Sequence, residues 1–140
     1  GGPTGRPGIP FTDTIPQNTE GDEFITLAIT PTKATNKLKI DVVLNVTNSL
    51  GADGYTTAAL FRDAEADARA VAWTSKNATI NNMAGIVFTH FEVAGTTSLI
   101  TIKIRIGAAA GGTTTFNGRG GARFFGGKLA SSITITEIQA

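Results

Sequence analysis

The chain reads Ile100-Thr101-Ile102-Lys103-Ile104-Arg105-Ile106 in the stretch that decides its fold. Isoleucine occupies every second position, and a threonine or a cation stands between. Successive side chains of an extended chain point to opposite faces, so one face of this segment is apolar and the other is polar. The stretch therefore predicts a β-strand with one face in a core and the other in water.

The same alternation recurs on both sides of this stretch, with turns of Gly, Asn, Asp and Thr between the runs. The expected strands cover residues 24–30, 38–46, 56–62, 70–75, 86–93, 100–106, 113–117 and 129–138. About eight short strands without intervening helices are typical of an antiparallel β-sandwich rather than a fold of alternating strands and helices. The sequence thus predicts an all-β, jelly-roll-like sandwich.

One segment, residues 58–72, is rich in alanine and has a helix as its alternative interpretation. Asp63, Glu65, Asp67 and Arg69 alternate there with alanines. A charge at every second residue does not give a helix an apolar face. Residues 63–67 are therefore expected to form the tip that joins two strands.

The expected strand within residues 85–95 is partly apolar on both faces. Val87, Phe91 and Val93 share one face with Thr89, and the other face consists of Ile86, Phe88, His90 and Glu92. Such a strand either lies centrally in the sandwich or buries its second face against another subunit. The second interpretation predicts an oligomer.

Composition limits the chain to one domain and excludes several function classes. The 140 residues include 12 Lys and Arg against 11 Asp and Glu, and no apolar run is long enough to cross a membrane. We expect neither nucleic-acid binding nor membrane insertion. With no cysteine, the chain has no disulfide framework, and oligomerisation is one of the usual ways to stabilise so small a domain.

The chain opens with three triplets that have glycine at every third position, Gly2, Gly5 and Gly8, with prolines beside them. This Gly-X-Y pattern is typical of a collagen-like triple helix, in which only glycine fits at the crowded axis. A flexible Pro/Gly linker is the alternative. Residues 1–12 are therefore interpreted as the end of a trimeric stalk or as a linker, and residues 13–140 as a single head domain.

No set of residues in the sequence predicts an enzyme, a cofactor or a metal site. His90 is the only histidine, and no nucleophile motif accompanies it. Zinc needs three or four clustered ligands. The acidic residues between positions 63 and 67 do not follow the twelve-residue calcium-loop pattern. They are interpreted as solvated turn carboxylates.

A glycine-rich segment precedes the last expected strand and contains Gly118, Gly120, Gly121, Gly126 and Gly127. It lacks the Gly-Lys-Ser/Thr ending and the helix of a phosphate-binding loop, and its single Arg-Gly-Gly differs from the repeated RNA-binding form. We interpret these glycines as a structural bend that needs positive φ angles or close backbone approach.

The C-terminal part of the chain carries a resemblance to a known family. It contains Phe-Asn-Gly at residues 116–118, Arg-Phe-Phe-Gly-Gly at 123–127 and Ile-Thr-Ile-Thr-Glu-Ile at 133–138. This succession resembles the C-terminal signature of domains in tailed-bacteriophage fibre, tail and head-appendage proteins, and residues 59–63 and 90–97 resemble earlier blocks of the same family. The resemblance implies a jelly-roll-like head domain, trimeric around a threefold axis, on a virion.

The hypothesis that follows is a virion structural protein, a homotrimeric head that attaches to a host surface through several weak sites at once. Its expected partners are its own copies, other virion proteins and a host cell-surface glycan, with Tyr55, Trp73 and Asn82 as possible glycan contacts. Trp73 is also interpreted as a core residue, since a lone tryptophan suits a buried strand. The alternatives are a purely architectural decoration or fibre-assembly trimer, and a C1q-like or spore-surface adhesion domain, which the collagen-like start also resembles.

Overall fold

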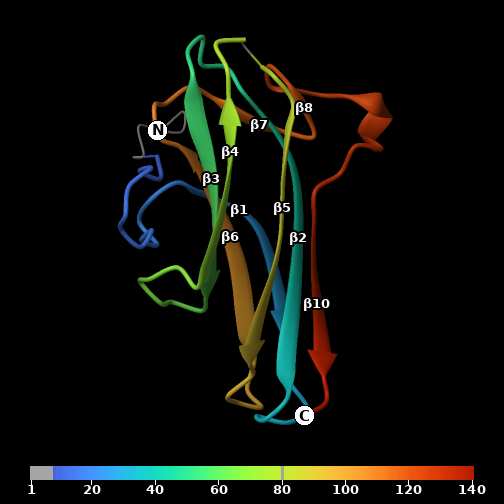
Figure 1. The fold of residues 1–140 in the computed structure, drawn as a ribbon. Helices are drawn as coiled ribbons and strands as arrows, with labels where there is room; N and C mark the ends of the chain where they lie inside the picture. The colour runs from blue at the N-terminus through green and yellow to red at the C-terminus, as the bar shows by residue number, and fades with distance from the viewer. Residues whose placement is uncertain (1–7, 80) are drawn as a thin grey trace.

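The computed structural model describes residues 8–79 and 81–140, and its strands form two facing sheets (Figure 1). One sheet has the order β1-β6-β3-β4, and the other has the order β10-β2-β5, with the short strand β7 also paired to β2. The strands of the first sheet are β1 (Asp22–Ile29), β3 (Gly54–Arg62), β4 (Ala70–Lys76) and β6 (Ile100–Ala108). Those of the second are β2 (Lys37–Asn48), β5 (Ala84–Val93), β7 (Thr114–Phe116) and β10 (Ser132–Ile138).

Every pairing among the described strands is antiparallel, which confirms the prediction of an all-β fold with antiparallel sheets. Each long strand lies within a few residues of its expected position. The alanine-rich segment forms no helix, since β3 ends at Arg62, β4 begins at Ala70 and a loop joins them. Apart from this hairpin and the last part of the chain, successive strands lie in opposite sheets.

The core lies between the two sheets and is made of the side chains that the alternation pointed inward. Its fully buried members on two strands are Leu38, Ile40, Val42 and Leu44 of β2 and Ile100, Ile102 and Ile104 of β6. β6 pairs with β1 on one side and β3 on the other, and β2 pairs with β5 and β10. The two strands with the most regular alternation are therefore the central strands of their sheets.

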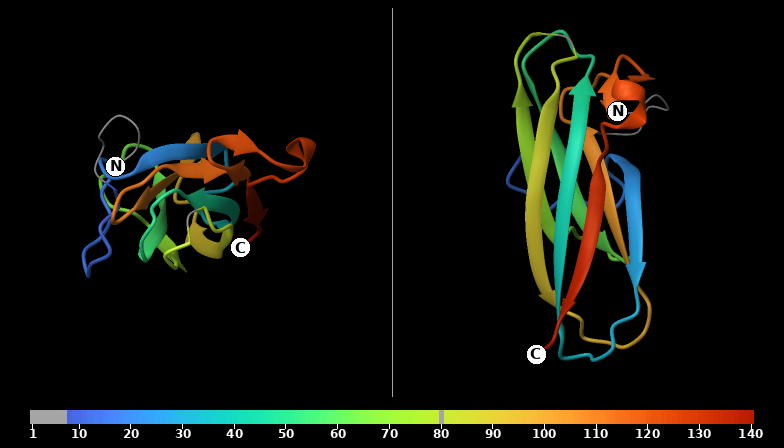
Figure 2. Two further views of the ribbon diagram at one scale, coloured as in Figure 1. Left: turned by 90° about the horizontal axis from the view of Figure 1, so that it is seen from above. Right: turned by 90° about the vertical axis from the view of Figure 1, so that its right-hand side faces the viewer.

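A second, smaller core lies on the outer face of the first sheet. Residues 8–21, which we call the arm, cross this face before β1 begins (Figure 2). Ile9 of the arm is fully buried and packs with Ala59 and Phe61, two of the outward side chains of β3. We therefore call β1-β6-β3-β4 the arm sheet and β10-β2-β5 the open sheet. The expected boundary between residues 12 and 13 falls inside the arm.

Between β7 and β10 the chain makes an excursion to the side of the sandwich (Figure 1). It contains two short paired strands, β8 (Gly118–Arg119) and β9 (Ala122–Arg123), and one turn of 3-10 helix, η1 (Phe125–Gly127). We call residues 117–131 the C-terminal hairpin. Among the described residues no helix has the length and apolar character to cross a membrane.

Candidate functional site

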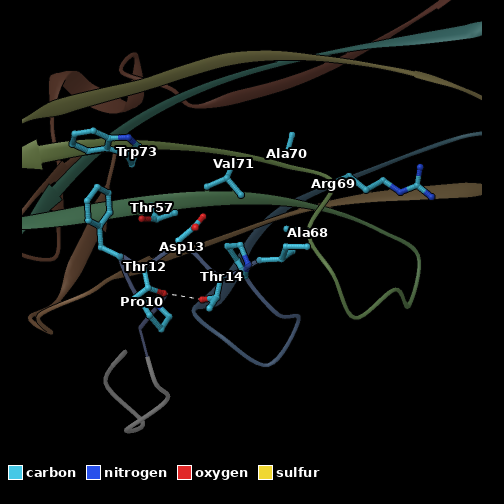
Figure 3. A pocket seen from close by; sticks show the side chains of 13 residues that line it. Pro10, Thr12, Asp13, Thr14, Thr57, Ala68, Arg69, Ala70, Val71 and Trp73 are labelled. Atoms are coloured by element: carbon cyan, nitrogen blue, oxygen red, sulfur yellow. Dashed lines mark hydrogen bonds between the residues drawn. The ribbon is translucent and has the colours of Figure 1, made fainter.

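The candidate site is a groove of about 550 Å³ between the arm and the outer face of β3 and β4 (Figure 3). The arm contributes residues 10–16, β3 contributes Thr57, and the other wall consists of residues 68–71 and Trp73. Its volume falls in the range of small-ligand pockets, about 300–1,000 Å³. The groove exists because the arm lies across the sheet without filling the space beside β4.

Close backbone approach holds the beginning of the arm on the sheet. A Cβ atom at Gly8 would lie 2.0 Å from the carbonyl oxygen of Ala108, and one at Gly107 would lie 2.6 Å from the nitrogen of Ile9. Neither distance is possible for a real side chain, so glycine is required at both positions. Gly8 thus has a role in the head itself, whereas Gly2 and Gly5 of the expected stalk lie outside the described residues.

Hydrogen bonds to the β3–β4 loop hold the far end of the arm. The backbone nitrogen of Asn18 donates to the oxygen of Ala66 at 2.8 Å, and that of Ala68 donates to the oxygen of Pro16 at 3.0 Å. The side chain of Gln17 donates to Asp67 at 2.8 Å. The arm is therefore fastened on both sides of the groove, and residues 10–16 form a bridge between the two attachments.

Three aromatic side chains meet at one end of the groove. Phe11 of the arm stacks on Tyr55 of β3, with ring centroids 4.0 Å apart and an interplanar angle of 13°. Trp73 of β4 meets both rings edgewise, at 4.9 Å and 70° from Phe11 and at 5.6 Å and 80° from Tyr55. All three remain partly exposed, Trp73 the most at 53%. Such contacts fix the rings without covering the whole indole.

Some polar groups of the groove already have hydrogen-bond or ion-pair partners, and others have none. The hydroxyls of Thr12 and Thr14 bond each other at 2.7 Å. Arg69 is held by Glu65 and Glu92, with nitrogen–oxygen distances of 2.5 and 2.9 Å. Its hydrogen bonds lower the pKa of the Glu65 carboxyl and raise that of its own guanidinium. Asp13 is exposed and has no bonded partner among the described residues. The hydroxyl of Thr57 is buried and also has no partner there.

Arg69 belongs to a charge cluster that lies behind the groove and joins the two sheets. Glu92 of β5 accepts from Arg62 of β3 at 2.6 Å as well as from Arg69, and Arg62 also donates to the oxygen of Ala94. His90 lies 3.2 Å from Glu92 but without hydrogen-bond geometry. Since the carboxylate is 7% exposed and shared by two guanidinium groups, the cluster serves to hold β5 against β3.

The acidic residues of the β3–β4 loop each have a separate structural partner. Asp63 accepts from the backbone of Thr101 at 2.8 Å, Glu65 binds Arg69, and Asp67 accepts from Gln17. Within the described ranges no group of three or more His, Cys, Asp or Glu is arranged to hold a metal ion. These carboxylates fasten the arm and the strand ends.

Two of the three expected glycan contacts come together, and one does not. Tyr55 and Trp73 share the aromatic end of the groove, whereas Asn82 lies in the β4–β5 loop and donates to Asn77 at 3.0 Å. The interpretation of Trp73 as a core residue is wrong. On β4 the small residues Ala70 and Ala72 face inward, so the intervening positions, Trp73 among them, face outward.

Sequence reasoning missed Phe11 and Thr57. Phe11 follows a Pro/Gly-rich start that was interpreted as stalk or linker, although the apolar pair Ile9 and Phe11 was a sign that this segment packs on something. No sequence signal distinguished Thr57 from the many other threonines of the strands. The arm brings both residues into the site.

The glycines of the C-terminal hairpin lie where the backbone needs them. Gly118 lies so close to β9 that a Cβ atom would be 1.8 Å from the oxygen of Ala122. The other four have φ between 59° and 84°: Gly120, Gly121, Gly126 and Gly127. Phe124 and Phe125 are exposed at 42% and 75%, and Phe125 itself has a φ of 54°. The hairpin thus carries two exposed aromatic rings.

The outer face of the open sheet carries exposed aliphatic and aromatic side chains. On β5 Val87 is 68% exposed, Phe91 55% and Val93 53%, while Ile86 on the opposite face is buried. Val43 of β2 pairs with Val87 and extends this apolar face. The described residues contribute no segment that covers it.

No protein-family model and no curated protein sequence matches this chain.

Proposed function

We propose that the chain is the head domain of a trimeric fibre or appendage on a tailed-bacteriophage virion and that it attaches the particle to a host surface by multivalent binding. In this role the domain is a jelly-roll-like sandwich that serves as a rigid carrier of binding sites. It needs neither a catalytic step nor a cofactor. The resemblance of residues 115–138 to phage fibre and appendage proteins suggests the setting. The uncovered face of β5 is the observation that carries the proposal.

That face supports self-association because apolar side chains gather on it. Val87, Phe91, Val93 and Val43 lie on adjacent strands of one sheet. Lys39 and Asp41 of β2 lie beside them on the same face. Exposed apolar side chains rimmed by polar ones mark an interaction site in a folded protein. A partner that covers it removes water from four large apolar side chains.

A threefold assembly needs more than one such surface. In a ring of three each copy uses two different patches, one for each neighbour. The C-terminal hairpin offers the second. Its backbone lies on the β10 side of the open sheet (Figure 1), and it carries the exposed Phe124 and Phe125. We expect the hairpin of one copy to contact the open sheet of the next.

The groove favours attachment over a purely architectural role. A domain that binds only its own copies and other virion proteins has no need of a separate groove with aromatic and polar walls. Three grooves on one rigid trimer bind a surface far more tightly than one, because the second and third contacts form at high effective concentration.

The test is the mass of the particle in solution, measured by light scattering after size exclusion. The full chain and a variant that begins at Gly8 are both expected to have the mass of three chains. The cut falls before Ile9 because that residue is buried against β3. A monomeric full chain contradicts the proposal.

A matched pair of substitutions locates the contact. Val87→Lys on β5 is expected to dissociate the trimer, whereas Val71→Lys, an equally small exposed valine on β4, is expected to leave the mass unchanged. Equal effects of the two changes contradict a contact through the open sheet. A trimer that binds no bacterial cells from a broad panel of strains supports the architectural alternative instead.

A further inference from the structure

We propose that the groove between the arm and β4 is a binding site for a neutral saccharide, with a pyranose ring stacked on Trp73 and sugar hydroxyls bonded to Asp13 and Thr57. The inference deepens the proposed function and rests on it for the biological setting, since it names the chemical class that the head binds. The groove itself is a property of the single chain.

The aromatic end of the groove supplies the stacking surface. Trp73 is 53% exposed, and the two rings that touch it stand at 70° and 80° to its plane. Neither Phe11 nor Tyr55 therefore stacks flat on the indole, since those two stack on each other. An indole held in place but open on part of its surface is suited to the apolar C–H face of a sugar ring, which needs a flat and rigid aromatic partner.

The polar lining supplies the groups that a sugar hydroxyl needs. Asp13 is exposed, lines the groove and has no bonded partner among residues 8–79 and 81–140. Its ionised carboxylate accepts hydrogen bonds only, so it suits hydroxyl donors. Arg69 is engaged by Glu65 and Glu92 and is not free to bind an anionic ligand. Among the described residues that line the groove the free charge is negative, which favours a neutral saccharide over an acidic one.

Thr57 is the independent sign of a ligand. The residue is 3% exposed and lines the groove, yet its hydroxyl has no hydrogen-bond partner among the described residues. Buried hydroxyls without a partner are uncommon, because each one loses its bonds to water and gains nothing in return. Figure 3 shows Thr57 between the aromatic end of the groove and Asp13 in that view. A sugar hydroxyl, both donor and acceptor, satisfies it.

A second copy of the chain fits the groove less well than a saccharide does. The apolar surface that suits another copy lies on the opposite sheet, on β5. The groove instead combines one flat aromatic ring, a carboxylate and three threonine hydroxyls within about 550 Å³. That mixture of a few polar groups and an aromatic wall is typical of small-molecule sites.

Trp73 also makes the test direct, because it is the only tryptophan of the chain. The full-length protein is first applied to a glycan array that includes bacterial surface saccharides. It is then titrated with the array glycan that binds best and with methyl glycosides of glucose, galactose and rhamnose. The emission of Trp73 follows binding. We expect a saturable change in emission with at least one of these probes.

Variants connect the binding to the groove. Trp73→Ala is expected to weaken binding roughly tenfold, as for loss of one aromatic contact, and Thr57→Val roughly fivefold, as for loss of one hydrogen bond. Saturation-transfer NMR replaces fluorescence for Trp73→Ala. Leu99→Ala, which truncates an exposed apolar side chain of the β5–β6 loop outside both the groove and the proposed subunit contacts, is expected to bind as the wild type does. Circular dichroism verifies that each variant is folded.

Three results overturn the inference: no binding to any array glycan, binding that Trp73→Ala leaves unchanged, or a fall in particle mass caused by Trp73→Ala. The last result assigns the groove to a subunit contact. Different results contradict the proposed function. A three-chain particle that adsorbs to cells but binds no saccharide contradicts this inference alone, and a monomer that binds the saccharide contradicts the trimer alone.

Discussion

Both outer faces of the sandwich carry apolar side chains, but these are buried on one face and exposed on the other. On the arm sheet two outward side chains of β3, Ala59 and Phe61, are buried because Ile9 lies over them. On the open sheet the outward side chains Val87 and Phe91 of β5 are exposed. An apolar outer face therefore does not by itself identify core or contact surface. What decides is whether another segment of the same chain reaches it.

The largest effect that tests this contrast is expected from Phe61→Ala. Phe61 is 1% exposed under the arm, so its truncation leaves a cavity and costs about 3–5 kcal/mol of the free energy of unfolding. Leu99→Ala, a truncation of an exposed side chain in the β5–β6 loop, is expected to cost less than about 0.5 kcal/mol. Urea unfolding of the two variants measures both values. Equal losses contradict a core beneath the arm.

A smaller difference is expected between two buried threonines. Thr47 of β2 donates to the oxygen of Gly118 at 3.1 Å, and Thr57 of β3 has no partner. Thr47→Val leaves that oxygen unpaired and is expected to cost about 1–3 kcal/mol, whereas Thr57→Val removes an unpaired group and is expected to be neutral or stabilising. Thermal unfolding distinguishes the two variants. A destabilised Thr57→Val shows that its hydroxyl has a structural partner.

On the open sheet, Glu137 of β10 gives a pH-dependent effect. Its carboxylate accepts from the side chain of Asn36 at 2.8 Å and from the backbone and hydroxyl of Thr32. These bonds, with that of Asn36 the largest cause, lower its pKa from the ordinary value of 4.5. A pKa that is lower in the folded state gives stability above the unfolded-state pKa, which is lost as the pH falls through the folded-state pKa.

The stability margin of the wild type over Glu137→Gln is therefore expected to be present at about pH 7 and to shrink at about pH 3. Urea unfolding at both pH values measures it. A margin that does not change with pH means that the charge of Glu137 adds no stability through its bonds to the loop at residues 32–36.

The smallest effect is expected beside the groove, at the ion pair of Glu65 and Arg69. Both side chains are substantially exposed, at 44% and 32%, so Glu65→Gln is expected to cost only about 0.2–1 kcal/mol. The loss is expected to decrease in high salt, because salt screens exposed charges. Unfolding in low and high salt checks this. A larger loss that salt does not change shows that Glu65 positions the arm.

Much of the fold was predictable because the alternation of side chains is a local property. The isoleucines of residues 100–106 share one face of their strand whichever strands pair with it. The alternating side chains of β2 and β5 are divided between two faces in the same way. The partners of each strand were not predictable, since pairing depends on which distant strands meet. The arm was missed for the same reason: Ile9 is buried by contacts with β3, some fifty residues away.

The site was predictable only in part. Tyr55 and Trp73 were expected as surface contacts because aromatic side chains with polar tips suit such a role, yet their proximity comes from the register that pairs β3 with β4. Asn82 was expected as a third contact but lies in the β4–β5 loop, bonded to Asn77, because the sequence does not show how a loop is placed relative to the sheet. The orphaned hydroxyl of Thr57 follows from the position of the arm, which only the assembled fold determines.

The placement of the two ends of the described chain has a mechanical consequence. Gly8 lies against Ala108 at the end of β6, while the backbone of Ala140 donates to Asn36 at the opposite end of the sandwich. Tension between these ends acts along the strands and pulls β10 lengthwise against β2. Its seven residue pairs, from Ser132 opposite Val43 to Ile138 opposite Lys37, then bear the load together rather than one after another. A domain pulled at these two points resists in shear, not by unzipping.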